Sequence, residues 1–358
     1  MKMTGNRNSR RGVSRREVLA GTVAIGATLA MPALQRAKAA DEVLYVNTWG
    51  GTWEAAAREH LFEPFTRETG IEIRTVSPVS YAKLAAQVRS GVYEFDVTTL
   101  GLVALAQANQ ADLLESVEES PLDEAQLWSG AVILNGVSSH AFSTGVAYRN
   151  DPYPNGGPQN WAEFWDAEKF EGSRSLQRYP ARVLAIALLA DGAKPDELFP
   201  YDLDRAFKSL DRIKPHVRVW WEQGPQSRQL LRDGEVDLIG IWNTQIPPLT
   251  RDKIPTTFVW DGAVLDKALW VVAKGTPRRE LGWRFVQFAV QPERLARFSA
   301  AENNGPLNPK SLEYLSEDEA RIMPTHPENL EKSVVLDPVA LGPQIDEFTE
   351  RFERWLLL

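Results

Sequence analysis

A glycine turn near residue 50 is the segment of this sequence whose residue types could bind an anion. Trp49 is followed by Gly50, Gly51 and Thr52, and a helix capped by Thr52 is expected to begin at Trp53. A glycine turn that leads into a helix N-terminus presents free backbone N–H groups and the positive end of the helix dipole. The turn therefore suits a carboxylate or another anion, and it equally suits a plain tight turn.

Tryptophans at the ends of expected strands form a second candidate group. Trp49 follows one such strand, and Trp242, with Asn243 beside it, ends another. Open α/β sheets bind ligands at the carboxyl ends of their strands, so we interpret Trp49 and Trp242 as site residues rather than core residues. Trp221 ends a third strand, but its neighbour Trp220 must point the opposite way, so at most one of this pair faces a site.

Residues for catalysis or metal binding follow no recognisable pattern. The sequence has no Gly-x-Ser-x-Gly elbow, no Walker loop and no cysteine, and its four histidines lie at no metal-ligand spacing. Carboxylate pairs exist, but among the 47 acidic residues after position 39 such a match carries little information. We therefore predict no catalytic residue, no metal and no cofactor.

Residues 1–39 are typical of an export signal. Arg15 and Arg16 form a twin-arginine pattern after a basic start, an uncharged small-residue segment follows, and a cleavage pattern ends at Ala39. The apolar run is too short and too weakly apolar for a stable membrane span. We expect a Tat signal peptide that is cleaved near Ala39/Ala40, passage of the folded protein through the Tat translocon, and a periplasmic location.

Charge and length restrict the possible partners. Residues 40–358 carry 32 Lys and Arg against 47 Asp and Glu, a formal charge of −15. Such a chain repels nucleic acid and anionic lipid surfaces. Its 319 residues suit two lobes better than one core. We expect a monomer that binds a small molecule and no nucleic acid.

The expected elements alternate between strands and helices. In the first unit they are a strand at 43–46, a helix from 53, a strand at 71–76, a helix at 81–89 and a strand at 95–99. After a turn-rich segment at 150–158, the second unit has strands at 217–221, 236–242 and 256–260, and a buried strand follows it at 268–273. A final amphipathic helix has Ile345, Phe348, Phe352 and Trp355 on one face. This alternation predicts a mostly parallel sheet covered by helices.

Eight short segments, taken together and in order, carry a resemblance to a known family. They are LYVNTWGG at 44–51, FTRETGI at 65–71, YAKL at 81–84, FDV at 95–97, WAEFW at 161–165, FEGSR at 170–174, GEVD at 234–237 and IWN at 241–243. Over nearly the whole mature chain, the sequence resembles the spermidine/putrescine-binding group of ABC-transporter solute-binding proteins.

The resemblance implies a fold and a mode of action. The fold is α/β and two-lobed, of the type II periplasmic-binding-protein kind, with a ligand cleft between the lobes. Lobe one would be 40–148 plus 265–315, and lobe two 149–264 plus 316–358. Ligand binding would close the hinge, and an ABC permease in the inner membrane would recognise the closed form.

Alignment with the polyamine-binding group also shows where this sequence departs from it. The group's two second-lobe acids fall at Pro180 and Val183, and its central aspartate falls at Lys267. A serine of its first lobe falls at Gly101. A shift of the alignment by one residue would return Asp266 to the site, so the sequence leaves open whether Asp266 or Lys267 faces the cleft.

The loss of these acids bears on the charge of the ligand. The candidate ligand-binding residues are Trp49, Gly50, Gly51, Thr52, Arg178, Tyr179, Trp221, Trp242, Asn243, Asp266 and Lys267. An ammonium group without a carboxylate partner in a closed cleft costs several kcal/mol, and Arg178 and Lys267 stand in place of the acids. We therefore predict an ABC-importer binding protein that prefers a carboxylate-bearing or zwitterionic ligand to a polyamine. The alternatives are a Tat-exported enzyme that uses carboxylates, and a ligand receptor for a signalling module.

Overall fold

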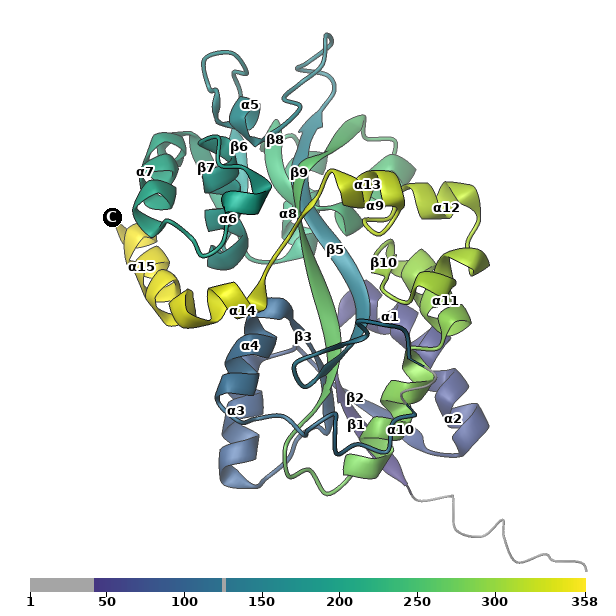
Figure 1. Cartoon of the computed structure of the whole chain (residues 1–358). Coiled ribbons are helices and arrows are strands. Elements are labelled where there is room, and N and C mark those ends of the chain that lie inside the picture. Colours follow the sequence, from purple (N-terminus) through teal and green to yellow (C-terminus); the bar gives the residue numbers. More distant parts are fainter. Residues whose placement is uncertain (1–41, 124–126) are drawn as a thin grey trace, which may run out of the picture. The chain divides into compact units, whose positions relative to one another are not determined.

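The computed structural model describes residues 42–123 and 127–358 (Figure 1), so the predicted export signal at 1–39 lies outside it. Within the described residues one mixed sheet has the strand order β2-β1-β3-β9-β5-β8-β6-β7, and β4 and β10 pair with β5 while β11 pairs with β9. The strands are β1 Val43–Asn47, β2 Glu72–Val76, β3 Val97–Gly101, β4 Val132–Ile133, β5 Gly136–Arg149, β6 Arg174–Gln177, β7 Val217–Trp221, β8 Leu238–Trp242, β9 Thr256–Val272, β10 Gly305–Pro306 and β11 Val334–Val335.

The long strands β5 and β9 join the two ends of the sheet. They pair antiparallel with each other over nearly their whole length, β3 pairs with the last residues of β9, and β8 pairs with the last residues of β5. The prediction of separate strands at 256–260 and 268–273 was wrong, because β9 runs unbroken through the polar residues between them. Asp266 and Lys267, which lie between the two predicted strands, are held in register with Phe142 and Ala141.

Helices cover both sides of this sheet. The longer ones are α1 Gly51–Ala57, α2 Glu63–Thr69, α3 Tyr81–Ser90, α4 Leu102–Gln110, α6 Pro180–Ala190, α7 Leu203–Ile213, α8 Gly224–Arg232, α10 Arg279–Ala289, α11 Pro292–Glu302 and α15 Ile345–Leu357. Shorter ones are α5 Trp161–Trp165, α9 Ile246–Arg251, α12 Glu317–Arg321, α13 Pro327–Glu331 and α14 Pro338–Leu341. Figure 1 shows α3, α4, α6, α7 and α15 on the left and α1, α2, α10 and α11 on the right.

Two large hydrophobic clusters lie on these two sides. One joins side chains of α3, α4, α6, α7 and α15, including the predicted face of Ile345, Phe348, Phe352 and Trp355, which is buried. The other joins α1, α2, α10 and α11. Strand alternation explains how β9 serves both clusters, because Val271 belongs to the first and its neighbours Trp270 and Val272 to the second.

The segment after β1 shows why its glycines are needed. Gly50 and Gly51 have φ values of 72° and 56°, which favour residues without a Cβ. Helix α1 begins at Gly51 rather than at Trp53, and Thr52 does not cap it, so the predicted cap was wrong. Helix α2 has Pro64 in its first turn and ends at Gly70, which is its left-handed C-cap.

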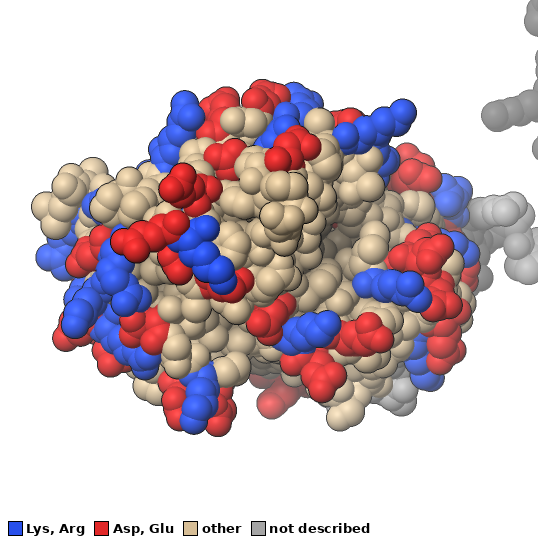
Figure 2. Space-filling view, turned by 90° about the horizontal axis from the view of Figure 1, so that it is seen from above, with Lys and Arg blue, Asp and Glu red and all other residues tan. Residues whose placement is uncertain are grey.

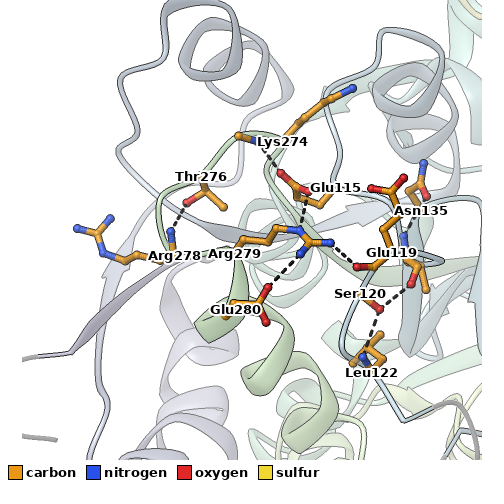
Figure 3. A network of polar contacts seen from close by, with 12 residues as sticks. Glu115, Glu119, Ser120, Leu122, Asn135, Lys274, Thr276, Arg278, Arg279 and Glu280 are labelled. Carbon is orange, nitrogen blue, oxygen red and sulfur yellow. Dashed lines mark hydrogen bonds and ion pairs between the residues drawn. The ribbon is translucent and has the colours of Figure 1, made fainter. Parts of the chain in front are cut away.

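A polar network fixes the start of α10 to the chain segment before β4 (Figure 3). The guanidinium of Arg279 is 2.9 Å from a carboxylate oxygen of Glu115 and 3.0 Å from one of Glu280, and it also donates to the carbonyl of Glu119. Glu115 in turn accepts the backbone N–H of Gly275. These contacts hold the loop after β9 against residues 115–120, so the elements that flank the lower part of the sheet are tied together.

The surface carries charges of both signs. On the face seen in Figure 2, Lys and Arg are interspersed with Asp and Glu, and no large area of one sign stands out. Such a surface offers no extended footprint for a polyanion. None of the helices in the described part of the chain is long and apolar enough to cross a membrane.

Candidate ligand-binding site

A buried ion pair lies where the middle of β9 meets the first turn of α6. A guanidinium nitrogen of Arg182 donates to Oδ2 of Asp266, and the two side chains are only 11% and 4% exposed. The other oxygen of Asp266 accepts the backbone N–H groups of Leu102, at 3.1 Å, and Lys267, at 2.9 Å. The aspartate is thereby fixed between the start of α4 and the start of α6.

Three aromatic rings surround the guanidinium of Arg182. Its central carbon lies 4.8 Å from the ring of Phe142, 5.2 Å from Tyr179 and 5.9 Å from Trp242. Cation–π contacts of this kind stabilise a cation that has lost its water. Within the described part of the chain, the buried Nε atom of Arg182 has no hydrogen-bond partner, so one donor of the fork that arginine offers to carboxylates is free there.

Glycine at position 101 leaves room for this arrangement. A Cβ atom at Gly101 would lie 3.1 Å from Oδ2 of Asp266. A side chain there would compete with Arg182 for the aspartate. Glycine at position 101, where the polyamine-binding group has a serine, therefore leaves the space that the Asp266–Arg182 pair occupies.

Trp242 also belongs to a second group of polar contacts, which is centred on Gln177. Its indole N–H donates to Oε1 of Gln177 at 3.1 Å, and the Thr144 hydroxyl donates to the same oxygen at 3.3 Å. Among the residues that the structure describes, the buried Nε2 atom of Gln177 has no hydrogen-bond partner. Leaving a buried donor unpaired costs roughly 1–3 kcal/mol, so Nε2 is a candidate contact for a polar group of a ligand.

The predicted aromatic residues differ in exposure. Trp49 is 47% exposed, and its indole N–H donates to the Thr99 hydroxyl at 3.0 Å, which fixes the ring beside the middle of β3. Trp242 contacts Phe142, Tyr179 and Trp221 at ring-centroid distances of 5.6, 5.6 and 5.1 Å. Trp221 is fully buried and donates to the carbonyl of Gly240, so it supports Trp242 from behind.

The predicted cations lie apart from this cluster. Arg178 is 38% exposed and pairs with Glu222, at 2.9 Å, and with Glu353. Lys267 follows Asp266 in β9, and alternation along the strand directs it to the opposite face. Asp266, rather than Lys267, therefore points toward Arg182.

The remaining predicted residues have local partners. Asn243 accepts the Ser143 N–H and donates to the carbonyl of Asn303, both at 2.9 Å. The Tyr179 hydroxyl donates to the carbonyl of Glu222 at 2.6 Å. The Thr52 hydroxyl donates to Glu302 at 2.9 Å. Gly50 and Gly51 form the turn described above.

Arg182, Phe142 and Gln177 were not found from the sequence, although a signal for Arg182 existed. The alignment placed the two second-lobe acids at Pro180 and Val183. A shift by one residue, the same shift that returns Asp266 to the site, places them at Tyr179 and Arg182. The structure brings Tyr179 and Arg182 together with Asp266.

Comparisons with known proteins agree with this architecture. The model of the bacterial extracellular solute-binding protein family matches residues 60–325. An ABC-transporter substrate-binding protein from Bradyrhizobium japonicum has a similar structure, with a TM-score of 0.82, 30% identity, and coverage of 88% of this chain and 99% of that one. The fold is therefore that of the two-lobed periplasmic binding proteins, as predicted.

Two relatives are similar in sequence. A gamma-aminobutyric acid-binding protein of Pseudomonas aeruginosa is 32% identical over 89% of this chain and 92% of its own length. A spermidine/putrescine-binding periplasmic protein of Haemophilus influenzae is 25% identical over 67% of each chain. The chain belongs to the bacterial extracellular solute-binding protein family, and it is the substrate-binding component of an ABC importer. The members of this family are binding proteins associated with transport, and its homologues are periplasmic.

Proposed function

We propose that this protein captures a small zwitterion, whose carboxylate binds the guanidinium of Arg182 and whose ammonium group binds Asp266. The observation that carries the proposal is the buried Arg182–Asp266 pair inside the rings of Phe142, Tyr179 and Trp242. A ligand with one charge of each sign can replace the internal pair, since each protein charge then keeps a partner. The role is binding without turnover, and no described residue is assigned to catalysis.

The free edge of the guanidinium supports a carboxylate as the anionic group. Arginine binds carboxylates through two parallel N–H donors, and the Nε of Arg182 is buried with no partner. Gln177 adds a second unpaired donor on Nε2 beside Trp242. Both donors are suited to oxygen atoms of the ligand, and neither suits an ammonium group.

The same residues disfavour a polyamine. Spermidine and putrescine carry two or more ammonium groups, and Asp266 is the one acid in the arrangement just described. Arg182 would repel the second ammonium group, and an aromatic face offers only about 0.5–2 kcal/mol per cation contact. The gamma-aminobutyric acid-binding relative has higher identity and coverage than the spermidine/putrescine-binding one, which agrees with this preference.

Calorimetric titration tests the proposal. We expect 4-aminobutyrate or another ω-amino acid to bind with a Kd in the micromolar range or below, about −8 kcal/mol, and spermidine, putrescine and simple alkylamines to bind at least 100-fold more weakly. Titration of alkyl carboxylates of equal length separates the two charges. Tight polyamine binding with no response to any carboxylate would contradict the proposal.

We propose further that the protein is exported through the Tat pathway and acts as a monomer in the periplasm after cleavage near Ala39. Support comes from the pattern around Arg15 and Arg16 and from the periplasmic homologues. Replacement of both arginines by lysine keeps the charge and removes the guanidinium geometry. We expect the double variant to remain in the cytoplasm as an uncleaved precursor. Normal periplasmic accumulation of that variant would contradict the assignment.

A further inference from the structure

Tyr201 lies beside the start of α6, next to the buried ion pair. Its side chain is buried, and its hydroxyl donates to the carbonyl of Ala181 at 2.6 Å. Ala181 immediately precedes Arg182 in the first turn of that helix. Burial raises the pKa of Tyr201 well above its ordinary value, and the charge of Asp266 adds to this rise while that of Arg182 opposes it. The tyrosine is therefore close enough to the pair for both charges to act on it.

The backbone of Tyr201 is held by a side chain from a distant part of the sequence. Oε1 of Gln344 accepts the N–H of Tyr201 at 2.9 Å, and Nε2 of Gln344 donates to the carbonyl of the same residue at 3.0 Å. Tyr201 lies between α6 and α7, outside any helix or strand, so no regular secondary structure pairs these two backbone groups. The ring packs against Phe199 and Phe348 at centroid distances of 5.4 and 5.9 Å. The position of Tyr201 is thus fixed at its backbone and at its ring.

The C-terminal segment that holds Tyr201 also contacts the neighbours of Asp266. In this segment β11 pairs with the two residues of β9 that precede Asp266, and the N–H of Leu336 donates to the carbonyl of Leu265 at 3.1 Å. Helix α14 then packs against α4, whose first residue donates its N–H to Asp266. Figure 1 shows this segment, in yellow between α13 and α15, reaching the start of α4. One stretch of chain is therefore bonded to the residue before Asp266 and, through Tyr201, to the residue before Arg182.

The first turn of α6 needs such a contact from outside the helix. Its N-cap residue, Tyr179, makes no side-chain capping bond, and the hydroxyl of Tyr179 donates instead to the carbonyl of Glu222. A guanidinium binds a carboxylate through two parallel N–H donors only when the fork is held in one orientation. The bond from Tyr201 restrains the backbone beside Arg182, so it controls the direction of the guanidinium and leaves the charge of the site unchanged.

We propose that Tyr201 is a positioning residue of the binding site, which holds Arg182 in the orientation that binds a ligand carboxylate, and that Gln344 anchors Tyr201. This inference rests on the proposed function, because it takes the ligand carboxylate to bind Arg182 and the ammonium group to bind Asp266. It adds that the affinity of the site for a carboxylate depends on a residue of the C-terminal segment that itself touches no ligand.

Tyr201→Phe tests the role of the hydroxyl, since it keeps the ring and removes one hydrogen bond. We expect the affinity for 4-aminobutyrate to fall about three- to tenfold, the effect of one such bond. Butylamine has the ammonium group and lacks the carboxylate, so its weaker binding, measured by competition, should change by no more than about twofold. A tyrosine with a purely structural role would lower the Tm and leave the ratio of the two affinities unchanged.

A double-mutant cycle tests whether Tyr201 acts through Arg182. Lysine at position 182 keeps the charge and lacks the fork that Tyr201 is proposed to orient. In the Arg182→Lys background, Tyr201→Phe should therefore change the affinity for 4-aminobutyrate by no more than about twofold, the limit within which independent effects are usually resolved. The full three- to tenfold loss in both backgrounds would show that the two residues act independently and would overturn the inference.

Gln344 provides a second test that leaves the tyrosine in place. Gln344→Ala removes both bonds to the backbone of Tyr201, so the ratio of 4-aminobutyrate to butylamine affinity should fall about threefold or more. Gln344→Glu retains the acceptor for the N–H of Tyr201 and loses the donor, so its ratio should lie between those of Gln344→Ala and wild type. If Tyr201→Phe does not fold, these two variants decide the question.

Tyr93→Phe is the matched control. The hydroxyl of Tyr93 also donates to a backbone carbonyl, that of Lys274 in the loop after β9, away from the ion pair. This variant should lower the Tm and leave both affinities unchanged. An unchanged ratio in Tyr201→Phe and Gln344→Ala, with tight 4-aminobutyrate binding by wild type, would overturn the inference alone. If wild-type protein does not bind 4-aminobutyrate or another ω-amino acid, the inference is rejected together with the proposed function.

Discussion

Two arginines four residues apart, Arg178 and Arg182, have opposite environments and therefore different importance. Arg178 lies just before α6, is 38% exposed and pairs with two surface carboxylates. Arg182 lies in the first turn of the same helix, is 11% exposed and pairs with the buried Asp266. Exposed ion pairs contribute about 0–1 kcal/mol, whereas removal of one partner of a buried pair costs about 3–5 kcal/mol. Because only Arg182 is buried, we expect it to contribute much more than Arg178 to stability and to ligand binding.

Replacement of the two arginines gives the largest expected contrast. Arg182→Ala should weaken binding of a zwitterionic ligand by about 2–5 kcal/mol, roughly 30- to 5,000-fold, because it removes the carboxylate partner. It should also destabilise the protein by about 3–5 kcal/mol, because Asp266 stays buried without a countercharge. Arg178→Ala should change either quantity by about 0.5 kcal/mol or less. Calorimetry and thermal unfolding measure both effects.

Arg182→Lys separates binding from stability. Lysine keeps a positive charge near Asp266 but lacks the planar fork that binds a carboxylate through two bonds. We expect the Tm of this variant to lie closer to wild type than that of Arg182→Ala, while ligand affinity stays low. If Arg178→Ala abolished binding and Arg182→Ala did not, the comparison would be reversed and the site would lie at the surface.

Sequence reasoning identified the architecture better than the site. Hydrophobic alternation and turn residues predicted β1, β2, β3, β7 and β8 and the helices α1, α3 and α15, because those patterns are local. The partner of Arg182 is 84 residues away, and its neighbour Phe142 lies in β5, a strand that the sequence pattern did not predict. A contact between distant segments leaves no local signal, so the sequence pattern did not identify Arg182 or Phe142.

The ambiguity at Asp266 and Lys267 has the same cause. Successive strand residues point to opposite faces, so an alignment error of one residue exchanges an acid for a base in the site. Pairing of β9 with β5 places Asp266 opposite Phe142, and that register could not be derived from composition or periodicity.

Trp242 and Trp49 also differ in burial, and we expect them to differ in their effects on ligand binding and on the Tm. Trp242→Ala should weaken ligand binding by about 2–4 kcal/mol, the range of a buried hot-spot residue, because it removes one wall around Arg182 and the donor to Gln177. Trp49→Ala should weaken binding by a similar or smaller amount, about 2 kcal/mol, with little effect on the Tm. Unchanged affinity in either variant, accompanied by a large fall in Tm, would identify that tryptophan as a core residue.

The neighbours Asp266 and Lys267 provide a control within one strand. Asp266→Asn keeps the shape and removes the charge, so the preference for a zwitterion over the matching alkyl carboxylate should fall by about 1.5–3 kcal/mol, the contribution of a hydrogen bond to a charged group. Lys267→Ala should change this preference by about 0.5 kcal/mol or less. Titration with 4-aminobutyrate and butyrate measures it, and a larger effect of Lys267→Ala would show that the lysine faces the ligand.

Histidines give the smallest expected contrast, and it concerns stability rather than binding. Burial lowers the pKa of His140 to about 3, and its Nε2 accepts the indole N–H of Trp53 at 3.3 Å. The unfolded chain binds a proton at this residue below pH 6.5 while the folded protein does not, so His140 makes stability fall as the pH decreases from 6.5 toward 3. At pH 5 this loss is about 2 kcal/mol.

His140→Gln retains an acceptor for Trp53 and cannot titrate, so its free energy of unfolding should fall less between pH 7 and pH 5 than that of wild type. Urea unfolding at pH 7 and pH 5 measures this difference. If the free energy of unfolding fell equally for wild type and His140→Gln, the buried histidine would not be the cause of the acid sensitivity.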